Sequence, residues 1–458
     1  MPEIQFRENA IFNGVTFPAH VLFTGATFNG HVFFEGANFF GIALFDKGTT
    51  FIRDAVFTGA KFRADDRMSG DLYIGNEVFS NARFTSALFV GARFRGIAAF
   101  NGAAFINGVS FEGAEFSGDA KFEDNASFGY YAVFNGATFG GEARFSGATF
   151  GGAASFDDRT TFICDALFNG VKFGGEALFN RAEFSGEARF SGATFGGEAR
   201  FSGAKFSGDA KFDGATFGGD AAFPGATFRA VADFSAREPG DNDQNKFLPM
   251  NFECTKFTGL ARFTNRRFLD TTNFRHAEFR RNAPQFHHCE LHQDTDFTGA
   301  IFCDRSAQAT RAYRTLKLAM EETRARNDQA TFFALEQECL QNDLNTPWNV
   351  RLVSRLYFAT ANYGQSLLRP LAWFFVVLVI FFAVYWILFT LAVASGVLFP
   401  DFLLVVRFTL RQVFRPFYAL GADTVPLGRA FFGAIHSLLN FVFLTLFVLA
   451  VRRRFIMR

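Results

Sequence analysis

Apolar positions in the first two thirds of the chain recur every five or six residues, and phenylalanine occupies most of them. Ala recurs two positions before Phe and a Gly often follows it, as in the segment from Ala137 to Gly140. A spacing of two places Ala and Phe on one side of a short extended segment, and Gly permits a tight turn after it. This short period predicts a solenoid of short strands with Phe and Ala facing inward. The clearest runs are Phe12, Phe17, Phe23, Phe28, Phe34, Phe39 and Phe45, and then Phe134, Phe139, Phe145, Phe150 and Phe156.

The steps between successive Phe alternate between five and six residues, as from Phe190 through Phe195 to Phe201. Four such segments would close one square coil, so we expect coils of about 22 residues. Neighbouring strands lie about 4.8 Å apart, which predicts a rod of roughly 60–70 Å. Phe makes up 71 of the 458 residues. We therefore expect a dry aromatic core in which each buried ring contributes about 1.5–3 kcal/mol.

The Ala-x-Phe-x-Gly unit resembles the repeat of the pentapeptide-repeat family, and the resemblance covers about residues 6–302. Members of that family form right-handed quadrilateral β-helices, so the resemblance implies this all-β fold for residues 1–303. The alternating step departs from the family, whose usual coil has about 20 residues. Two stretches interrupt the repeat, Arg63–Gly75 and about Ala236–Met250, and the polar run Glu238–Lys246 in the second predicts a surface loop.

The outward positions of the repeat carry charges of both signs, which we expect to pair and neutralise one another. Some pentapeptide-repeat proteins are acidic rods that mimic DNA and bind topoisomerases. With 45 basic and 44 acidic residues, this chain lacks the charge for such mimicry. It also lacks a basic stripe, so we expect no nucleic-acid partner. The pairs are Glu142/Arg144, Glu187/Arg189, Glu198/Arg200 and Asp209/Lys211.

The segment His287–His292 contains His287, His288, Cys289 and His292, with His276 nearby, and raises the question of a metal site. Cys289 stands where the repeat requires a small inward residue, which leaves the histidines at outward or turn positions. Spacing typical of zinc ligands is absent, so we favour a structural role and predict no metal. The remaining cysteines are scattered, which suits a reducing compartment. They are Cys164, Cys254, Cys303 and Cys339.

Motifs for catalysis or cofactor binding are not apparent in the sequence. A Gly-rich phosphate loop and a nucleophile elbow are both missing, and the many glycines belong to the turns of the repeat. We therefore predict that the chain is not an enzyme, has no catalytic residues and takes no cofactor.

After Asp304 the Phe period gives way to helical spacing. A first helix is predicted over Ser306–Arg326, and Asn327 and Asp328 are predicted to cap a second one, about Gln329–Asn342, with Phe333 and Leu335 inward. We expect this α-helical hairpin, residues 304–346, to cover the open end of the β-helix, where unpaired strand edges need covering. The inward residues expected of the first helix are Ala309, Ala312, Tyr313, Leu316 and Met320.

Residues 347–458 have the pattern of a membrane domain with two α-helical spans, about 370–394 and 430–451. The N-terminus lacks the basic and apolar segments of a signal peptide. Arg351, Arg355 and Arg369 precede the first span and Arg452–Arg454 follow the second, so both ends are expected in the cytoplasm. We expect a multi-pass protein of the bacterial inner membrane with a cytoplasmic N-terminal domain and C-terminus.

The segment between the spans, 401–429, predicts an amphipathic helix followed by an extended stretch. Pro416 ends the helix. Arg407, Arg411 and Arg415 mark one face at intervals of four, and a second face is apolar. The apolar face comprises Leu403, Val406, Leu410 and Phe414.

This order of elements resembles the pore domain of two-span, pore-loop cation channels over about 90 residues. Asp423 aligns with the acid that follows their filter, and Pro426–Arg429 resembles the start of their inner helix. The filter glycines fall on Leu420 and Ala422, while Gly421 takes the Tyr position. The filter motif is therefore lacking. Leu420 and Ala422 each add a Cβ where close-packed backbone carbonyls must face an ion, so potassium selectivity is not expected.

Several side chains of this domain are candidates to line a pore. Rings of Arg favour anions; alternatively, the arginines belong to an interfacial helix whose guanidiniums reach toward lipid headgroups. His436 and Asn440 are polar, lie four positions apart in the second span, and are costly in lipid, so they should face another helix or water. The candidates are Arg407, Arg411, Arg415, Gly421, Asp423, His436 and Asn440.

Two functions remain open at this point. The leading hypothesis is a channel-like domain that conducts ions as a homo-oligomer, a tetramer by resemblance, because two spans cannot enclose a water path alone. The alternative is a non-conducting membrane scaffold whose β-helix presents a long regular surface to a protein partner. An exposed apolar or single-charge stripe along the rod would favour the scaffold, and an oligomer with His436 and Asn440 facing its axis would favour the channel.

Overall fold

The computed structural model describes residues 4–41, 43–45, 49–62, 76–236, 245–392, 402–418 and 425–455. The chain divides into two compact units, Met1–Asp304 and Arg305–Arg458. The predicted covering of the β-helix by the hairpin, and the separation of the hairpin (304–346) from the membrane domain (347–458), stay predictions.

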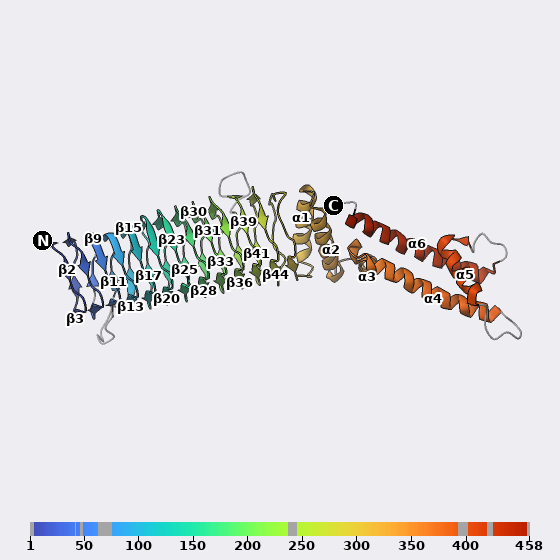
Figure 1. The fold of residues 1–458 in the computed structure, drawn as a ribbon, viewed down its shortest axis with the longest axis horizontal. Coiled ribbons are helices and arrows are strands. Elements are labelled where there is room, and N and C mark those ends of the chain that lie inside the picture. The colour runs from blue at the N-terminus through green and yellow to red at the C-terminus, as the bar shows by residue number, and fades with distance from the viewer. Residues whose placement is uncertain are drawn as a thin grey trace. The chain divides into compact units, whose positions relative to one another are not determined.

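The first unit is a parallel β-solenoid that runs from β1 (Gln5–Phe6) to β45 (Ile301–Phe302). Most strands are two residues long, and each pairs in parallel with the equivalent strand of the next coil (Figure 1). Phe195 pairs with Phe217, which confirms the predicted coil of 22 residues. One coil comprises β30 (Thr194–Phe195), β31 (Ala199–Arg200), β32 (Lys205–Phe206) and β33 (Ala210–Lys211).

The Phe rings of successive coils form four columns inside the solenoid, one for each face. Within a column the rings stack in parallel, as for Phe179 on Phe201, with centroids 4.9 Å apart and planes at 2°. Rings from columns on opposite faces meet edge to face, as for Phe190 and Phe201 at 86°. The ring spacing therefore equals the spacing of the strands. One unbroken column consists of Phe12, Phe34, Phe57, Phe89, Phe111, Phe134, Phe156, Phe179, Phe201, Phe223, Phe252, Phe274 and Phe297.

Glycine meets two separate requirements at the corners of each coil. Gly192 has a φ of +66°, in the left-handed region that side chains disfavour, and the Ala193 amide closes the turn onto the Phe190 carbonyl at 3.0 Å. Gly197 has no space for a side chain, because a Cβ there would lie 2.6 Å from the Gly175 carbonyl oxygen of the previous coil.

Three long strands join two faces near the start of the solenoid. They are β9 (Thr50–Val56), β12 (Arg83–Leu88) and β15 (Ala104–Ser110), and they continue through a corner where other coils turn. The pairing of β12 shifts register between Phe84 and Ser86, as expected of a bulge. These coils therefore present a wider, continuous strand surface.

The predicted break near Ala236–Met250 is shorter than expected. Residues 237–244 of it, like Arg63–Gly75 of the other break, lie outside the described residues, but β38 (Lys246–Phe247) and β39 (Met250–Asn251) already belong to the solenoid. Phe247 meets Phe217 edge to face at 67° instead of stacking on it. One Phe column is therefore interrupted here, while the column that contains Phe223 and Phe252 continues.

Arg266 fills the space at this interruption. It takes the inward position that Ala usually holds two residues before Phe, and it is fully buried. Its Nε donates to the Phe234 carbonyl at 2.6 Å and Nη1 to the Ala215 carbonyl at 3.1 Å, and its guanidinium lies 4.4 Å from the Phe247 ring centroid. Burial lowers the pKa of Arg266 to about 10. The charge is accommodated because it bonds to backbone carbonyls and lies on an aromatic face.

The second unit begins with a hairpin of α1 (Ala309–Glu322) and α2 (Arg326–Asn342). The buried residues of α1 are those predicted, Ala309, Ala312, Tyr313, Leu316 and Met320. Inside the hairpin, the Glu336 carboxylate bonds to Arg314 at 2.7 Å and Lys317 at 2.6 Å.

Two details of α2 differ from the sequence-based expectation. The helix starts at Arg326, and its first turn contains Asp328, so Asn327 and Asp328 do not precede and cap it. Leu335 is buried as predicted, but Phe332 is buried in place of Phe333. Phe333 is half-buried, and its ring packs edge to face on Tyr363, with centroids 6.3 Å apart, and lies 5.9 Å from Lys317 Nζ of α1.

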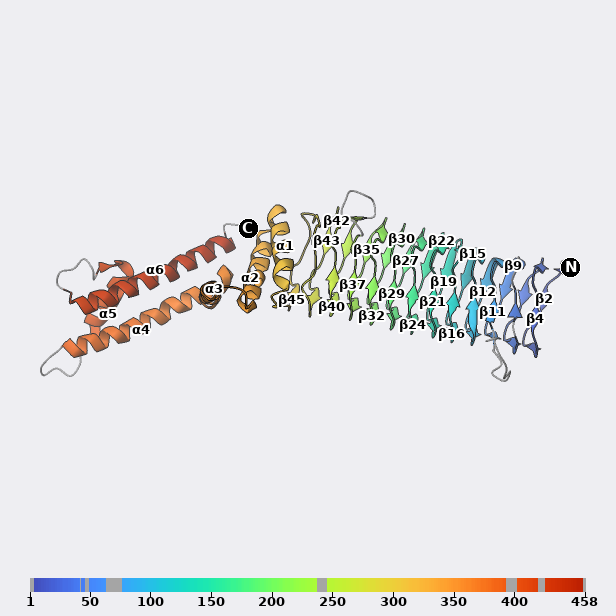
Figure 2. The same ribbon diagram turned by 180° about the vertical axis from the view of Figure 1, so that it is seen from behind.

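The described residues of the unit also form a short 3-10 helix, η2 (Asn362–Gly364), and four further α-helices: α3 (Trp348–Ala361), α4 (Leu368–Ala392), α5 (Phe402–Phe414) and α6 (Leu427–Phe455). α4 and α6 run side by side, and α5 packs on both (Figures 1 and 2). Leu368–Leu391 and Leu427–Arg452 are long and apolar enough to cross a membrane. Both therefore fit the two predicted spans.

We predict that Phe179→Ala lowers the free energy of unfolding by about 3–5 kcal/mol, because the cavity would interrupt a stacked column. Urea unfolding followed by far-UV circular dichroism measures the change. Ile163→Ala serves as control, since Ile163 is exposed on the same solenoid, and we expect it to change stability by no more than about 0.5 kcal/mol. Equal effects of the two substitutions would contradict the stacked core.

Arg266→Met is expected to cost about 2–4 kcal/mol, because Met fills the volume but leaves buried carbonyls without their donor. The matched control is the neighbouring Arg267→Met, whose exposed partner Glu290 lies at 2.8 Å and which should cost about 1 kcal/mol or less. Thermal and urea unfolding of both variants tests the difference. If Arg266→Met leaves the stability unchanged, the free-energy cost of burying the charge cancels the stabilisation from its hydrogen bonds.

Candidate functional site

Helix α5 is anchored at one end of the span pair by a face that contains both apolar and polar residues. Val405, Thr409 and Gln412 are buried, whereas the predicted apolar face is outward, with Leu403, Leu410 and Phe414 exposed and Val406 half-buried. The helix ends at Phe414, ahead of Pro416 as predicted. Ser437 of α6 fixes the end of α5, because its Oγ donates to the Gln412 carbonyl at 3.2 Å and accepts from the Phe417 amide at 3.1 Å.

His436 and Asn440 lie on the buried face of α6. The His436 ring stacks on Phe381 of α4 at 4.6 Å, and its Nδ1 lies 3.2 Å from the Tyr385 hydroxyl. Asn440, one turn further along α6, is 2% exposed. Polar groups are thus enclosed between α4 and α6 of one chain.

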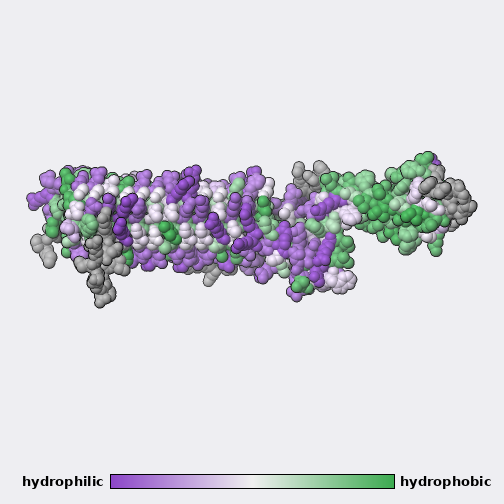
Figure 3. Space-filling model, turned by 90° about the horizontal axis from the view of Figure 1, so that it is seen from below, coloured by the Kyte–Doolittle hydropathy of each residue, from purple (hydrophilic) through white to green (hydrophobic). Residues whose placement is uncertain are grey.

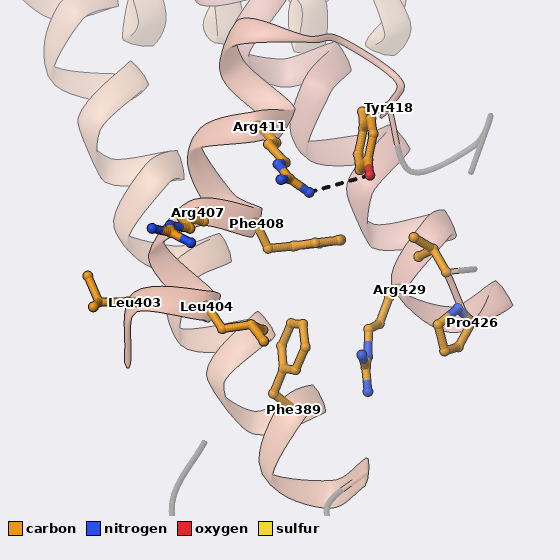
Figure 4. Close-up of a pocket in the computed structure, with 10 residues that line it drawn as sticks. Phe389, Leu403, Leu404, Arg407, Phe408, Arg411, Tyr418, Pro426 and Arg429 are labelled. Atoms are coloured by element: carbon orange, nitrogen blue, oxygen red, sulfur yellow. Dashed lines mark hydrogen bonds between the residues drawn. The ribbon is translucent and has the colours of Figure 1, made fainter. Parts of the chain in front are cut away.

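A pocket of about 430 Å³ lies where α4, α5 and α6 meet (Figure 4). Three arginines and Tyr418 supply its polar lining. Apolar side chains of α4 and α5, together with Val425 and Pro426 just before α6, supply the rest. The lining residues are Phe389, Leu403, Leu404, Arg407, Phe408, Arg411, Tyr418, Val425, Pro426 and Arg429.

Aromatic rings hold two of the three guanidiniums. Arg429 lies over the Phe389 ring, 4.0 Å from its centroid. Arg411 lies 5.4 Å from the Tyr418 centroid and donates to its hydroxyl at 3.4 Å (Figure 4). Arg407 is exposed at the edge. Among the residues that the structure describes, no carboxylate lines this pocket.

The candidate pore-lining residues fall into separate places. Arg407 and Arg411 share the pocket, Arg415 is exposed outside it, and His436 and Asn440 are enclosed between the spans. Gly421 and Asp423 lie outside the described residues. A role of these residues in lining a pore stays a prediction.

The pocket and the helix contacts include residues that the sequence did not single out. Arg429, Phe389 and Tyr418 come from three different segments, so no local spacing joins them. For Gln412 and Ser437 a signal existed, since both are polar residues within apolar helices. Arginine side chains provide planar donors for carboxylate or phosphate oxygens, which makes this pocket suited to an anion.

The His287–His292 segment has the arrangement expected of a repeat corner. His288 has a φ of +57°, a turn conformation, and the Cys289 thiol donates to the Phe263 carbonyl at 2.8 Å. Within the described part of the chain, no group of three His, Cys, Asp or Glu side chains could hold a metal ion. Burial raises the pKa of Cys289 to about 12.

Comparison with protein families agrees with the fold. Residues 79–125, 158–204 and 190–236 match the family described as Pentapeptide repeats (9 copies). The solenoid is accordingly a pentapeptide-repeat β-solenoid. No curated protein matched the chain.

Cysteine labelling tests the assignment of Cys289. At pH 8 we expect a maleimide to label Cys164, Cys254 and Cys303, which are exposed, and to leave Cys289 unreacted. The labelling of Cys289 should rise only as the pH approaches about 12, because the thiolate is the reactive form. Mass spectrometry of peptides identifies the labelled sites, and the urea-unfolded chain is the control in which all five cysteines react. Rapid labelling of native Cys289 would contradict a buried structural thiol.

Proposed function

We propose that this protein is a membrane-anchored scaffold, in which α4 and α6 cross the bilayer and the pentapeptide-repeat solenoid presents a long surface to a protein partner. The membrane helices supply attachment, and the solenoid supplies recognition. Conduction of ions is not part of this function.

One observation carries the proposal: between the arginines at the span ends (Arg369, Arg429 and Arg452), the described outward side chains of the two spans are apolar except for hydroxyls bonded to their own helix. Thr390 donates to the Trp386 carbonyl and Thr445 to the Phe441 carbonyl, each at 2.7 Å. His436 and Asn440 point the other way, into the contact with α4. An apolar exterior suits lipid, whereas a water-filled path requires polar or carbonyl groups along it.

The surface of the solenoid is consistent with a neutral scaffold. Arg144 pairs with Glu142 at 2.5 Å, and Arg189 with Glu187 and Arg200 with Glu198 at 2.6 Å each, as predicted. Lys211 departs from the expected pair with Asp209, because it reaches across the coils to Glu187 at 2.5 Å. Figure 3 shows hydrophilic and neutral rows over the solenoid and a hydrophobic surface over the spans.

One group of exposed apolar side chains interrupts this polar surface, and we define it as the outer patch: Ile52, Ile106, Tyr130 and Tyr131. Phe51, Phe84, Phe105 and Phe128 stack on successive coils, so Ile52 and Ile106 lie on the same face, two coils apart. The Tyr130 amide donates to the Asn107 carbonyl at 3.2 Å, beside Ile106. Exposed aromatic and aliphatic groups of this kind are typical of protein contacts.

A second candidate is the oligomeric channel. It is favoured by the exposed positions of Arg407 and Arg411 on α5 and of Arg415 just after it. In a tetramer such arginines would form rings that attract anions.

Flux through liposomes distinguishes the two functions. We expect the reconstituted full chain to pass neither potassium nor chloride above the rate of protein-free liposomes, and Arg411→Glu to leave that result unchanged. Retention of the protein through an alkaline carbonate wash verifies insertion. Flux whose ion preference shifts in Arg411→Glu would replace the scaffold by the channel, and loss of the protein in the wash would exclude both.

A further inference from the structure

We propose that the pocket at the ends of the spans binds the headgroup phosphate of an anionic phospholipid. This inference goes beyond the scaffold function, since it assigns a ligand to Arg407, Arg411 and Arg429. It does not depend on a partner of the solenoid.

The charge of the pocket is the first argument. Residues 347–458 contain eleven arginines, no lysine and only two acidic residues, Asp401 and Asp423. In the described chain, Arg411 and Arg429 lie against aromatic rings, and no ion pair involves Arg407, Arg411 or Arg429. Guanidiniums offer several N–H donors in a fixed plane, which matches the oxygens of a phosphate. The Tyr418 hydroxyl, already beside Arg411, adds one more polar group.

The position of the pocket along the spans is the second argument. Phe389 lies in the last turn of the first span, Leu368–Leu391, and Arg429 lies in the first turn of the second, Leu427–Arg452. Both residues are therefore at the same end of the apolar zone. Lipid headgroups occupy this level of a bilayer, and Arg side chains near span ends reach toward it.

The apolar part of the lining separates a lipid from a free anion. Leu403 and Leu404 are exposed on α5 beside the arginines, and Phe389 and Phe408 form the wall between α4 and α5 (Figure 4). A small hydrated anion makes no use of these side chains. An acyl chain does, because its contact with them removes apolar surface from water.

Quenching of Trp386 by brominated lipid tests the proposal in the detergent-solubilised full chain. Trp386 packs near Phe402 at the start of α5, with ring centroids 6.4 Å apart. Trp348→Phe and Trp373→Phe leave it as the only Trp among the three of the chain. We expect brominated phosphatidate to quench it at about tenfold lower concentration than brominated phosphatidylcholine, which corresponds to one charge-assisted bond of about 1.4 kcal/mol.

Arg411→Gln should remove this preference for phosphatidate. The matched control is Arg415→Gln, which removes the same charge from the same segment at an exposed position outside the pocket, and it should retain the preference. Gel filtration confirms that both variants are folded.

Three results would overturn the proposal. If both variants lose the preference for phosphatidate equally, the preference comes from general surface charge and not from the pocket. If the single-Trp protein with all its arginines shows no preference for phosphatidate, the guanidiniums are already neutralised. The acidic residues of 347–458 that could do this are Asp401 and Asp423. Displacement of phosphatidate by millimolar inorganic phosphate at constant ionic strength would assign the pocket to a free anion. None of these results bears on flux, so the lipid site and the scaffold can fail separately.

Discussion

The stacking of phenylalanine rings at the strand spacing is the interaction on which the solenoid depends. Phe179 and Phe201 lie 4.9 Å apart because their strands do, so side-chain stacking and backbone pairing impose the same repeat distance. The Ala and Gly positions of the repeat serve this agreement between ring spacing and strand spacing. Ala leaves room for the rings of the next column, and residues such as Gly192 and Gly197 let the chain turn closely enough to stay in register. A solenoid of this kind is stabilised by contacts between neighbouring coils, and no larger core is needed.

Arg266 shows what happens where that match is lost. Phe247 no longer stacks on Phe217, and the space is filled by a charged side chain that bonds to carbonyls of the adjacent coils. The remaining columns continue past the interruption, as Phe223 and Phe252 do. The repeat thus tolerates a local defect because each coil is held on several faces at once. The buried guanidinium of Arg266 is tolerated because its N–H groups donate to the carbonyls of Phe234 and Ala215.

The membrane unit follows the opposite distribution of polarity. Its polar groups, His436, Ser437 and Gln412, are enclosed between helices, and apolar side chains face outward. Within the described spans, arginines lie only near the ends, at Arg369, Arg429 and Arg452. The Phe389 ring supports Arg429, and the Tyr418 ring supports Arg411 of α5. The proposed attachment to lipid and the proposed recognition of a lipid phosphate both rest on this distribution, whereas a hydrated path would require it to be reversed.

The sequence by itself determined the solenoid, its coil of 22 residues, the two spans and the end of α5 before Pro416. These properties are local: they depend on a period, a composition or a proline within a short stretch. Tertiary structure decided which residues share a site. Arg429, Phe389 and Tyr418 come together only through the packing of α4, α5 and α6, and the burial of Phe332 in place of Phe333 depends on where α1 and Tyr363 lie. The burial of Arg266 could not be predicted from the sequence for the same reason. A charged residue at an inward position is stable only when distant carbonyls and a displaced ring surround it.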